Sequence, residues 1–286
     1  MSAGISSFIA IVFQLLVVRK VLILLAIVFV SGAVYGQGSG CFVPGAGGEL
    51  KLETNIDFSR YDGFFVGEFH GVYGVPAVKL ALVKYLCREQ GVTDIFMEIG
   101  FSAAYLFNTY LETGDTAFIT RPRLIYTAKL PDMACWEGLY AFNKGLKHKI
   151  SIHGMDFERA DFLKVLKLVM PTGVLYPAAI AQSLTFIDTV NVSSIGWQQS
   201  ATQHAFDSVY IMLKADLDRN LEAYRAYFGD TFELVLRIMR NKCVMTNFHQ
   251  RNGAMYQNLM QQVAADNIGK FVVFSGLAHA DKANEG

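Results

Sequence analysis

Four short apolar segments, separated by stretches with helical periodicity, constrain the fold of this chain more than any other feature. Apolar runs of this length that are bounded by turn residues are typical of buried strands. Strands that alternate with helices form a mostly parallel sheet with helices packed on it. The sequence therefore predicts an α/β fold, with strands at 64–66, 95–97, 150–152 and 271–274.

Apolar residues recur at helical spacing between these strands. Ser102 is the expected N-cap of the second helix, and Gly91 and Gly114 are expected to end the first two. The expected helices span 75–90, 102–113 and 136–147.

A long amphipathic stretch, about 178–265, precedes the last strand. It has breaks near 191–196 and at Gly229. We expect this stretch to form a helical insertion before the last strand, because its apolar residues keep the helical spacing on both sides of each break.

The segment 1–36 is unlike the rest of the chain, since 26 of its residues are apolar and its only charges are Arg19 and Lys20. Positive charge, an apolar stretch and the small residues at 31–33 form the pattern of a secretory signal peptide. The alternative is an uncleaved membrane anchor, although the basic pair interrupts the run of about 20 apolar residues that a span needs. We therefore expect an exported protein that meets the membrane only through this segment.

The rest of the chain has the composition of a soluble protein. Over the whole chain, Lys and Arg total 25, as do Asp and Glu, so the net charge is zero. A neutral chain has no global attraction to nucleic acid, and we expect no nucleic-acid partner. The glycine-rich segment 37–50 is expected to be a linker, and 51–286 to form one domain.

Ionisable residues follow all four expected strands. Ligands of open parallel sheets bind beyond the carboxyl ends of the strands, so we expect these side chains to gather at one site. Glu68 and His70 lie two residues apart in an extended segment and share a face. A carboxylate beside an imidazole suits a general base. The strand-end residues are Glu68, His70, Glu98, Asp156 and His279.

The sequence lacks the common motifs for nucleophilic, nucleotide-dependent or zinc-dependent catalysis. It contains no G-x-S-x-G elbow, P-loop, dinucleotide fingerprint or HExxH pair. Carboxylates and imidazoles can bind a metal, but no local pair at i, i+4 spacing supports one. We expect no metal and no cofactor, and the remaining mechanism is attack by a water that an imidazole activates.

These residues resemble the motifs of the erythromycin esterase family of macrolide-inactivating hydrolases. The resemblance covers roughly residues 50 to 286. The matching pieces are Asp57-Phe58, 67–71 (Gly-Glu-Phe-His-Gly), Lys79, 97–100, 108–115, Trp136 with Asn143, 154–156, Arg251, Met255, Asn258 and 271–279.

The resemblance implies a sheet-and-helix fold with a metal-independent esterase site and a small-molecule ester or lactone as substrate. It implies His70 as the general base, with Glu68 and Glu98 orienting and tuning it. Lys79 and His279 are then placed to stabilise charge on the substrate carbonyl. The candidates for substrate binding are Asn108, Asp156 and Arg251.

The chain departs from the family pattern in four respects. One residue separates Glu68 from His70, where the family often has two. Lys79 stands where arginine is frequent, which keeps the charge but loses bidentate geometry. Gly276 and Leu277 replace a His-Asn pair, so His279 alone remains of that motif. The chain also stops seven residues after His279, and we expect a domain shorter than its relatives.

Three functions stay open. The first is an exported ester or lactone hydrolase. The second is a haem- or ligand-binding module of the related ChaN-like fold, because apolar walls with a few histidines suit a flat ligand. The third is an inactive, truncated homologue.

Overall fold

The structure of the chain is a computed structural model. It describes residues 10–12, 24–26, 40–45, 49–69, 72, 74–120, 130–159, 161–190, 200–241 and 248–280.

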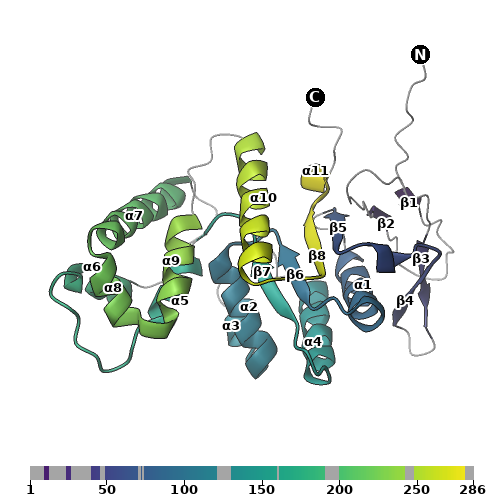
Figure 1. Ribbon diagram of the computed structural model, residues 1–286, viewed down its shortest axis with the longest axis horizontal. Coiled ribbons are helices and arrows are strands. Elements are labelled where there is room, and N and C mark those ends of the chain that lie inside the picture. Colours follow the sequence, from purple (N-terminus) through teal and green to yellow (C-terminus); the bar gives the residue numbers. More distant parts are fainter. Residues whose placement is uncertain are drawn as a thin grey trace, which may run out of the picture. The chain divides into compact units, whose positions relative to one another are not determined.

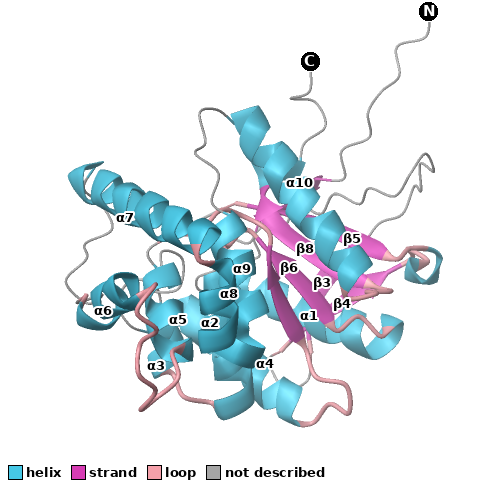
Figure 2. Ribbon diagram, turned by 60° about the vertical axis from the view of Figure 1, so that its left-hand side comes forward, coloured by secondary structure: helices cyan, strands magenta, loops and turns pink. Residues whose placement is uncertain are grey.

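A four-stranded sheet with flanking helices confirms the predicted α/β fold (Figure 1). The strands are β5 (Gly63–Glu68), β6 (Asp94–Met97), β7 (Ser151–Gly154) and β8 (Phe271–Gly276). Their order in the sheet is β5-β8-β6-β7, and β8 pairs in parallel with both β5 and β6. The last strand of the chain therefore lies between the first two, which brings their carboxyl ends together (Figure 2).

Burial on the sheet explains why these segments are strands. Phe64, Phe96, Val272 and Phe274 are each at most 1% exposed. The Phe271 ring packs edge-on against Phe96, with 5.5 Å between the ring centroids. Strands that helices cover on both faces have near-continuous apolar sequences. These apolar sequences are the pattern from which the four strands were predicted.

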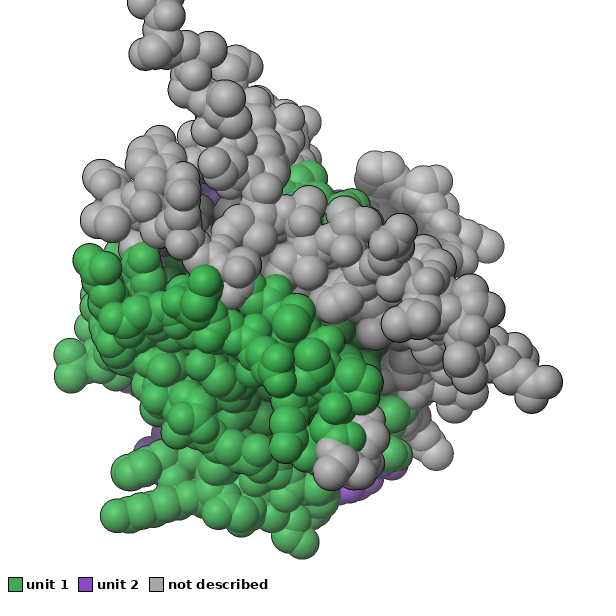
Figure 3. Space-filling view, turned by 90° about the vertical axis from the view of Figure 1, so that its right-hand side faces the viewer, with its two compact units in different colours: residues 1–98, 129–153, 260–286 green, residues 99–128, 154–259 purple. Residues whose placement is uncertain are grey.

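The chain divides into two compact units. Unit 1 (1–98, 129–153 and 260–286) is green in Figure 3, and unit 2 comprises 99–128 and 154–259. In unit 1, the helices are η1 (Phe58–Arg60), α1 (Val75–Gln90), α4 (Leu130–Lys144) and α11 (Leu277–Ala280). In unit 2, they are α2 (Phe101–Thr113), α3 (Ala117–Thr120), α5 (Asp161–Val169), α6 (Ala181–Thr189), α7 (Ser200–Arg219), α8 (Leu221–Phe228), η3 (Gly229–Thr231) and α9 (Phe232–Asn241). The boundary between the units falls within α10 (Phe248–Ala265).

The helices follow the sequence pattern, with two differences. Gly91 and Gly114 end α1 and α2 in the left-handed conformation, as expected. Ser102 is not the N-cap of α2, because the helix begins at Phe101 and Gly100 is the cap residue. The helices before β8 begin at Asp161, earlier than expected, and the break at Gly229 is confirmed by its φ of 51°. The break near 191–196 lies outside the described residues.

The N-terminal part contains two antiparallel strand pairs. β1 (Ala10–Val12) pairs with β2 (Leu24–Ala26), and β3 (Gly40–Pro44) pairs with β4 (Leu50–Thr54). The second pair differs from the expected linker over 37–50, because Phe42 is buried and gives the segment an apolar contact. Most of the expected signal peptide or anchor lies outside the described residues. Among the residues that are described, no helix is long and apolar enough to cross a membrane.

Candidate functional site

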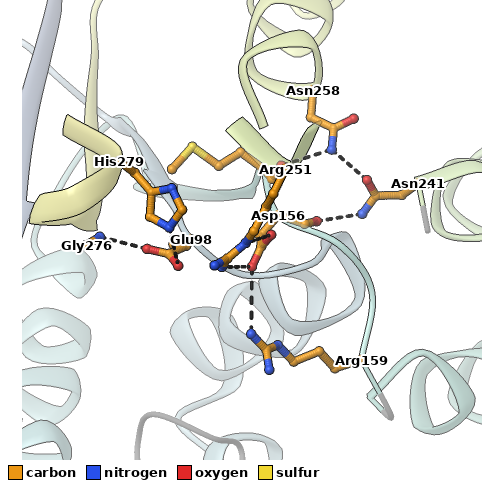
Figure 4. Close-up of polar contacts among 9 residues, drawn as sticks. Glu98, Asp156, Arg159, Asn241, Arg251, Asn258, Gly276 and His279 are labelled. Carbon is orange, nitrogen blue, oxygen red and sulfur yellow. Dashed lines mark hydrogen bonds and ion pairs between the residues drawn. The ribbon is translucent and has the colours of Figure 1, made fainter. Parts of the chain in front are cut away.

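Both carboxylate oxygens of Glu98, the residue after β6, have a partner in unit 1 (Figure 4). Oε2 accepts a hydrogen bond from the Gly276 N–H at 2.7 Å, and Oε1 lies 3.3 Å from Nε2 of His279 on α11. The side chains of Glu98 and His279 are both 8% exposed. An ionised carboxylate only accepts hydrogen bonds, so this contact favours the tautomer with the proton on Nε2. The basic nitrogen of the neutral His279 ring is then Nδ1.

A second ion pair lies at the end of β5. Lys79 Nζ, near the start of α1, is 2.8 Å from Oε1 of Glu68, the last residue of the strand. The ammonium also lies 4.9 Å from the centroid of the Phe274 ring. With side-chain exposures of 20% and 10%, Lys79 and Glu68 are poorly solvated, which strengthens their attraction relative to a surface pair.

Strand β8 contacts both pairs. Its Gly276 binds Glu98 and stands in register with Glu68, and its Phe274 ring lies under Lys79. Four of the five expected catalytic residues therefore gather at the carboxyl edge of β5, β8 and β6. The fifth, His70, lies outside the described residues. Gly276 was not among the expected site residues, because a backbone N–H has no signal in a sequence.

Asp156 is the centre of a separate polar cluster within unit 2. Arg251 holds its carboxylate in a bidentate contact, with Nε 3.0 Å from Oδ1 and Nη2 2.6 Å from Oδ2 (Figure 4). Arg159 Nη2 lies 3.9 Å from Oδ2. The Asp156 side chain is 1% exposed and that of Arg251 is 19% exposed. The ion pair satisfies a buried charge, and it fixes the start of α10 to the segment after β7.

Two asparagines extend this cluster. Asn241 Nδ2, at the end of α9, donates to the Asp156 carbonyl at 2.8 Å. Asn258 Nδ2, on α10, donates to the Met155 carbonyl at 2.9 Å and to Asn241 Oδ1 at 2.6 Å. Buried carbonyls need such partners, and these bonds join two helices to one turn.

Glu158 caps helix α2 from the same turn and is completely buried. Its carboxylate accepts hydrogen bonds from the N–H of Phe101 at 2.7 Å and the N–H of Ser102 at 3.2 Å. The Ser102 hydroxyl and Asn241 Nδ2 donate to it as well. Glu158 thus satisfies two of the N–H groups that the first turn of a helix leaves unpaired, although it lies far from α2 in the sequence.

Close contacts around the backbone explain why glycine occupies the last position of the 97–100 motif and the first position of the 154–156 motif. A Cβ at Gly100 would lie 2.7 Å from Glu158 Oε2, and one at Gly154 would lie 2.4 Å from the Gly100 carbonyl oxygen. Any other residue at either position would displace the backbone or the buried carboxylate.

Burial raises the pKa of Glu158 from 4.5 to about 7, and the hydrogen bonds from Ser102, Asn241 and Phe101 offset only part of this rise. Between these two pH values the folded state holds a proton that the unfolded chain releases, so the free energy of unfolding falls as pH rises. We predict that the stability advantage of wild type over Glu158→Gln shrinks by about 3 kcal/mol across this window and is constant at higher pH. Denaturant unfolding of both proteins at about pH 5 and about pH 8 measures it.

The exposed Glu112, also on α2, gives the control for this prediction. Glu112→Gln should keep the same stability relative to wild type at both pH values. A difference between wild type and Glu158→Gln that stays constant with pH would contradict the assignment.

Two further residues of the motifs, Asn108 and Asn143, lie outside these ion pairs. Asn108 lies half-buried in the middle of α2, in the same unit as Asp156. Asn143 has a structural contact, since its Oδ1 accepts from the Ile150 N–H at 2.8 Å. Across the described part of the chain, no group of His, Cys, Asp and Glu side chains is arranged to hold a metal ion.

No family model matches the chain, and no curated protein matches it significantly. Solved structures give a distant likeness. A protein from Bacillus cereus is 19% identical, with a TM-score of 0.45 over 75% of this chain and 56% of its own. An erythromycin esterase mutant in its open conformation is 16% identical, with a TM-score of 0.41 over 70% of this chain and 57% of its own.

A succinoglycan biosynthesis protein is 18% identical, with a TM-score of 0.47 over 74% of this chain and 56% of its own. This chain thus spans a little over half the length of these proteins. The likeness concerns the fold alone, and the family that the motifs resemble is not confirmed by sequence.

Proposed function

We propose that this chain is an exported hydrolase that cleaves a carboxylic ester or lactone by attack of an imidazole-activated water. The observation that supports this proposal best is the contact of Glu98 with both the Gly276 N–H and His279. A carboxylate that orients an imidazole is a common arrangement in general acid–base catalysis. The sequence pattern of segment 1–36, which is typical of a secretory signal peptide, supports the proposed location.

In the proposed reaction, His70 takes a proton from water while the hydroxide oxygen bonds to the carbonyl carbon. The carbonyl electrons move to oxygen, and Lys79 stabilises the resulting oxyanion, as does the His279 ring when both of its nitrogens carry a proton. When the intermediate collapses, the C–O bond to the alcohol breaks and the His70 imidazolium returns the proton to the leaving oxygen. The products are an acid and an alcohol, or a hydroxy acid from a lactone, and no metal or cofactor takes part.

The two carboxylates have distinct roles in this scheme. Glu98 sets the orientation and tautomer of His279. Glu68 holds Lys79 at the sheet edge through the 2.8 Å ion pair. Asn108 and Arg251 are the proposed contacts for the substrate, and the buried Asp156 holds the more exposed Arg251 in position.

A panel of p-nitrophenyl esters, simple lactones and erythromycin, incubated with the purified full chain, tests the proposal. We expect at least one substrate to gain one water in mass and to release a proton, with the same rate in the presence of a chelator. A panel with no turnover would reject the hydrolase and favour the inactive homologue.

Haem binding is the second candidate. A histidine whose ring nitrogen contacts a carboxylate is typical of metal-ligating imidazoles, and His279 has this contact with Glu98. Titration of the protein with haem would then give a Soret band that His279→Ala removes. An unchanged haem spectrum would exclude this function.

A further inference from the structure

We propose that unit 1 carries a basic patch that binds the anionic headgroups of a lipid bilayer. The patch comprises Lys84, Arg88, Lys144, Lys147 and Lys149. It is formed by the last turns of α1 and α4 and by the loop that leads into β7. Arg88, Lys144, Lys147 and Lys149 are exposed, and Lys84 is half-buried.

Two sets of contacts show that these cations lie together. Lys84 Nζ and Arg88 Cζ lie 5.9 Å and 5.0 Å from the centroid of the same ring, that of Phe142 on α4. Lys149 Nζ donates to the carbonyl of Lys144 at 2.9 Å. Lys147 lies between them in the loop, beside the exposed His148.

Helix capping accounts for only part of this charge. Cations are favourable near the carboxyl end of a helix, and Lys149 serves α4 in this way through the carbonyls of Asn143 and Lys144. The acidic residues of these two helices are Glu89, Asp132 and Glu137, and only Glu89 lies in a last turn, so the five basic residues are in excess at this end of the helices. An excess of like charge on one surface costs folding stability, and an anionic partner would offset that cost.

Two features favour a bilayer over a nucleic acid as this partner. The sequence carries the apolar segment 1–36, and stable membrane attachment usually combines an apolar anchor with a basic surface. The rings of Tyr140 and Phe142, each beside a cation, also suit a membrane interface.

The patch lies away from the proposed catalytic residues. Helices α1 and α4 lead into β6 and β7, so their last turns lie at the amino edge of the sheet. Glu98 and His279 follow the carboxyl ends of β6 and β8. Binding to a bilayer through the patch would thus leave the edge that carries Glu98 and His279 turned away from the lipid.

Vesicle binding of the full chain tests this proposal. The vesicles are phosphatidylcholine alone, or phosphatidylcholine with about one third phosphatidylglycerol. We expect Lys144→Glu/Lys147→Glu to weaken binding to the anionic vesicles at least about 30-fold, since each basic residue near such a surface contributes roughly fivefold and each glutamate adds repulsion. Binding of wild type to the anionic vesicles should also fall as salt is raised.

Lys51→Glu/Arg60→Glu is the matched control, because both residues are exposed in unit 1 and the charge change is the same. It should change binding less than twofold on either vesicle, and the apolar segment should bind neutral vesicles equally in all three proteins. Equal losses in both double variants, or no loss in either, would overturn the proposal. Tighter binding of wild type to random-sequence double-stranded DNA than to the anionic vesicles would also overturn it.

Discussion

Glu98→Gln is expected to lower kcat/KM for ester hydrolysis by about 100- to 1000-fold while the protein stays folded. The glutamine oxygen can still accept the Gly276 N–H bond that Glu98 Oε2 makes, so the end of β8 should keep its place. The charge that attracts the His279 ring at 3.3 Å is lost, and a side-chain amide can donate to the ring as well as accept from it. Both ring tautomers then become accessible, and the protonated ring that stabilises the oxyanion in the proposed mechanism loses its counter-charge.

A pH profile separates this role from a merely structural one. The Glu98→Gln variant should show a changed pH dependence of kcat/KM together with an unchanged free energy of unfolding within about 1 kcal/mol. Glu53→Gln, at an exposed position of β4, removes one carboxylate from the same unit and should leave both quantities as in wild type. A Glu98→Gln protein with wild-type kcat/KM would remove Glu98 from the proposed mechanism.

Asp156→Ala is expected to lower the free energy of unfolding by about 3 kcal/mol. The substitution leaves the guanidinium of Arg251, which is 19% exposed, without its bidentate partner, and Arg159 nearby adds a second positive charge. Denaturant unfolding followed by circular dichroism measures the change, and the midpoint should move with little change of slope.

The exposed ion pair between Lys214 and Asp218 is the matched comparison, since it has a similar contact of 2.5 Å but side chains that are 40% and 48% exposed. Because exposed pairs contribute little, Asp218→Ala should cost less than about 0.5 kcal/mol. Equal losses of the free energy of unfolding in the two variants would mean that burial does not increase the contribution of Asp156 to stability.

The sequence predicted most of the sheet and the helices around it, because both depend on local patterns. The four apolar runs became β5 to β8, and Gly91 and Gly114 end their helices as their freedom to adopt positive φ suggests. The carboxyl edge of the sheet was also predictable, since parallel strands share one edge for their ends.

Partnerships between distant residues could not be predicted in the same way. Glu98 and Gly276 are 178 residues apart, and Met155 and Asn258 are 103 residues apart. Ser102 has the residue type of an N-cap, yet the buried Glu158 binds the first N–H groups of α2 instead. Local propensity cannot show that a carboxylate from another segment is available for this purpose.

The most direct test of the proposed function is the rate of ester or lactone hydrolysis by purified wild type and His70→Ala, measured on the best substrate of the panel. Imidazole base catalysis predicts that wild type turns the substrate over and that His70→Ala loses about 100-fold or more of kcat/KM while its unfolding curve is unchanged. Equal turnover by a folded His70→Ala protein would contradict the mechanism.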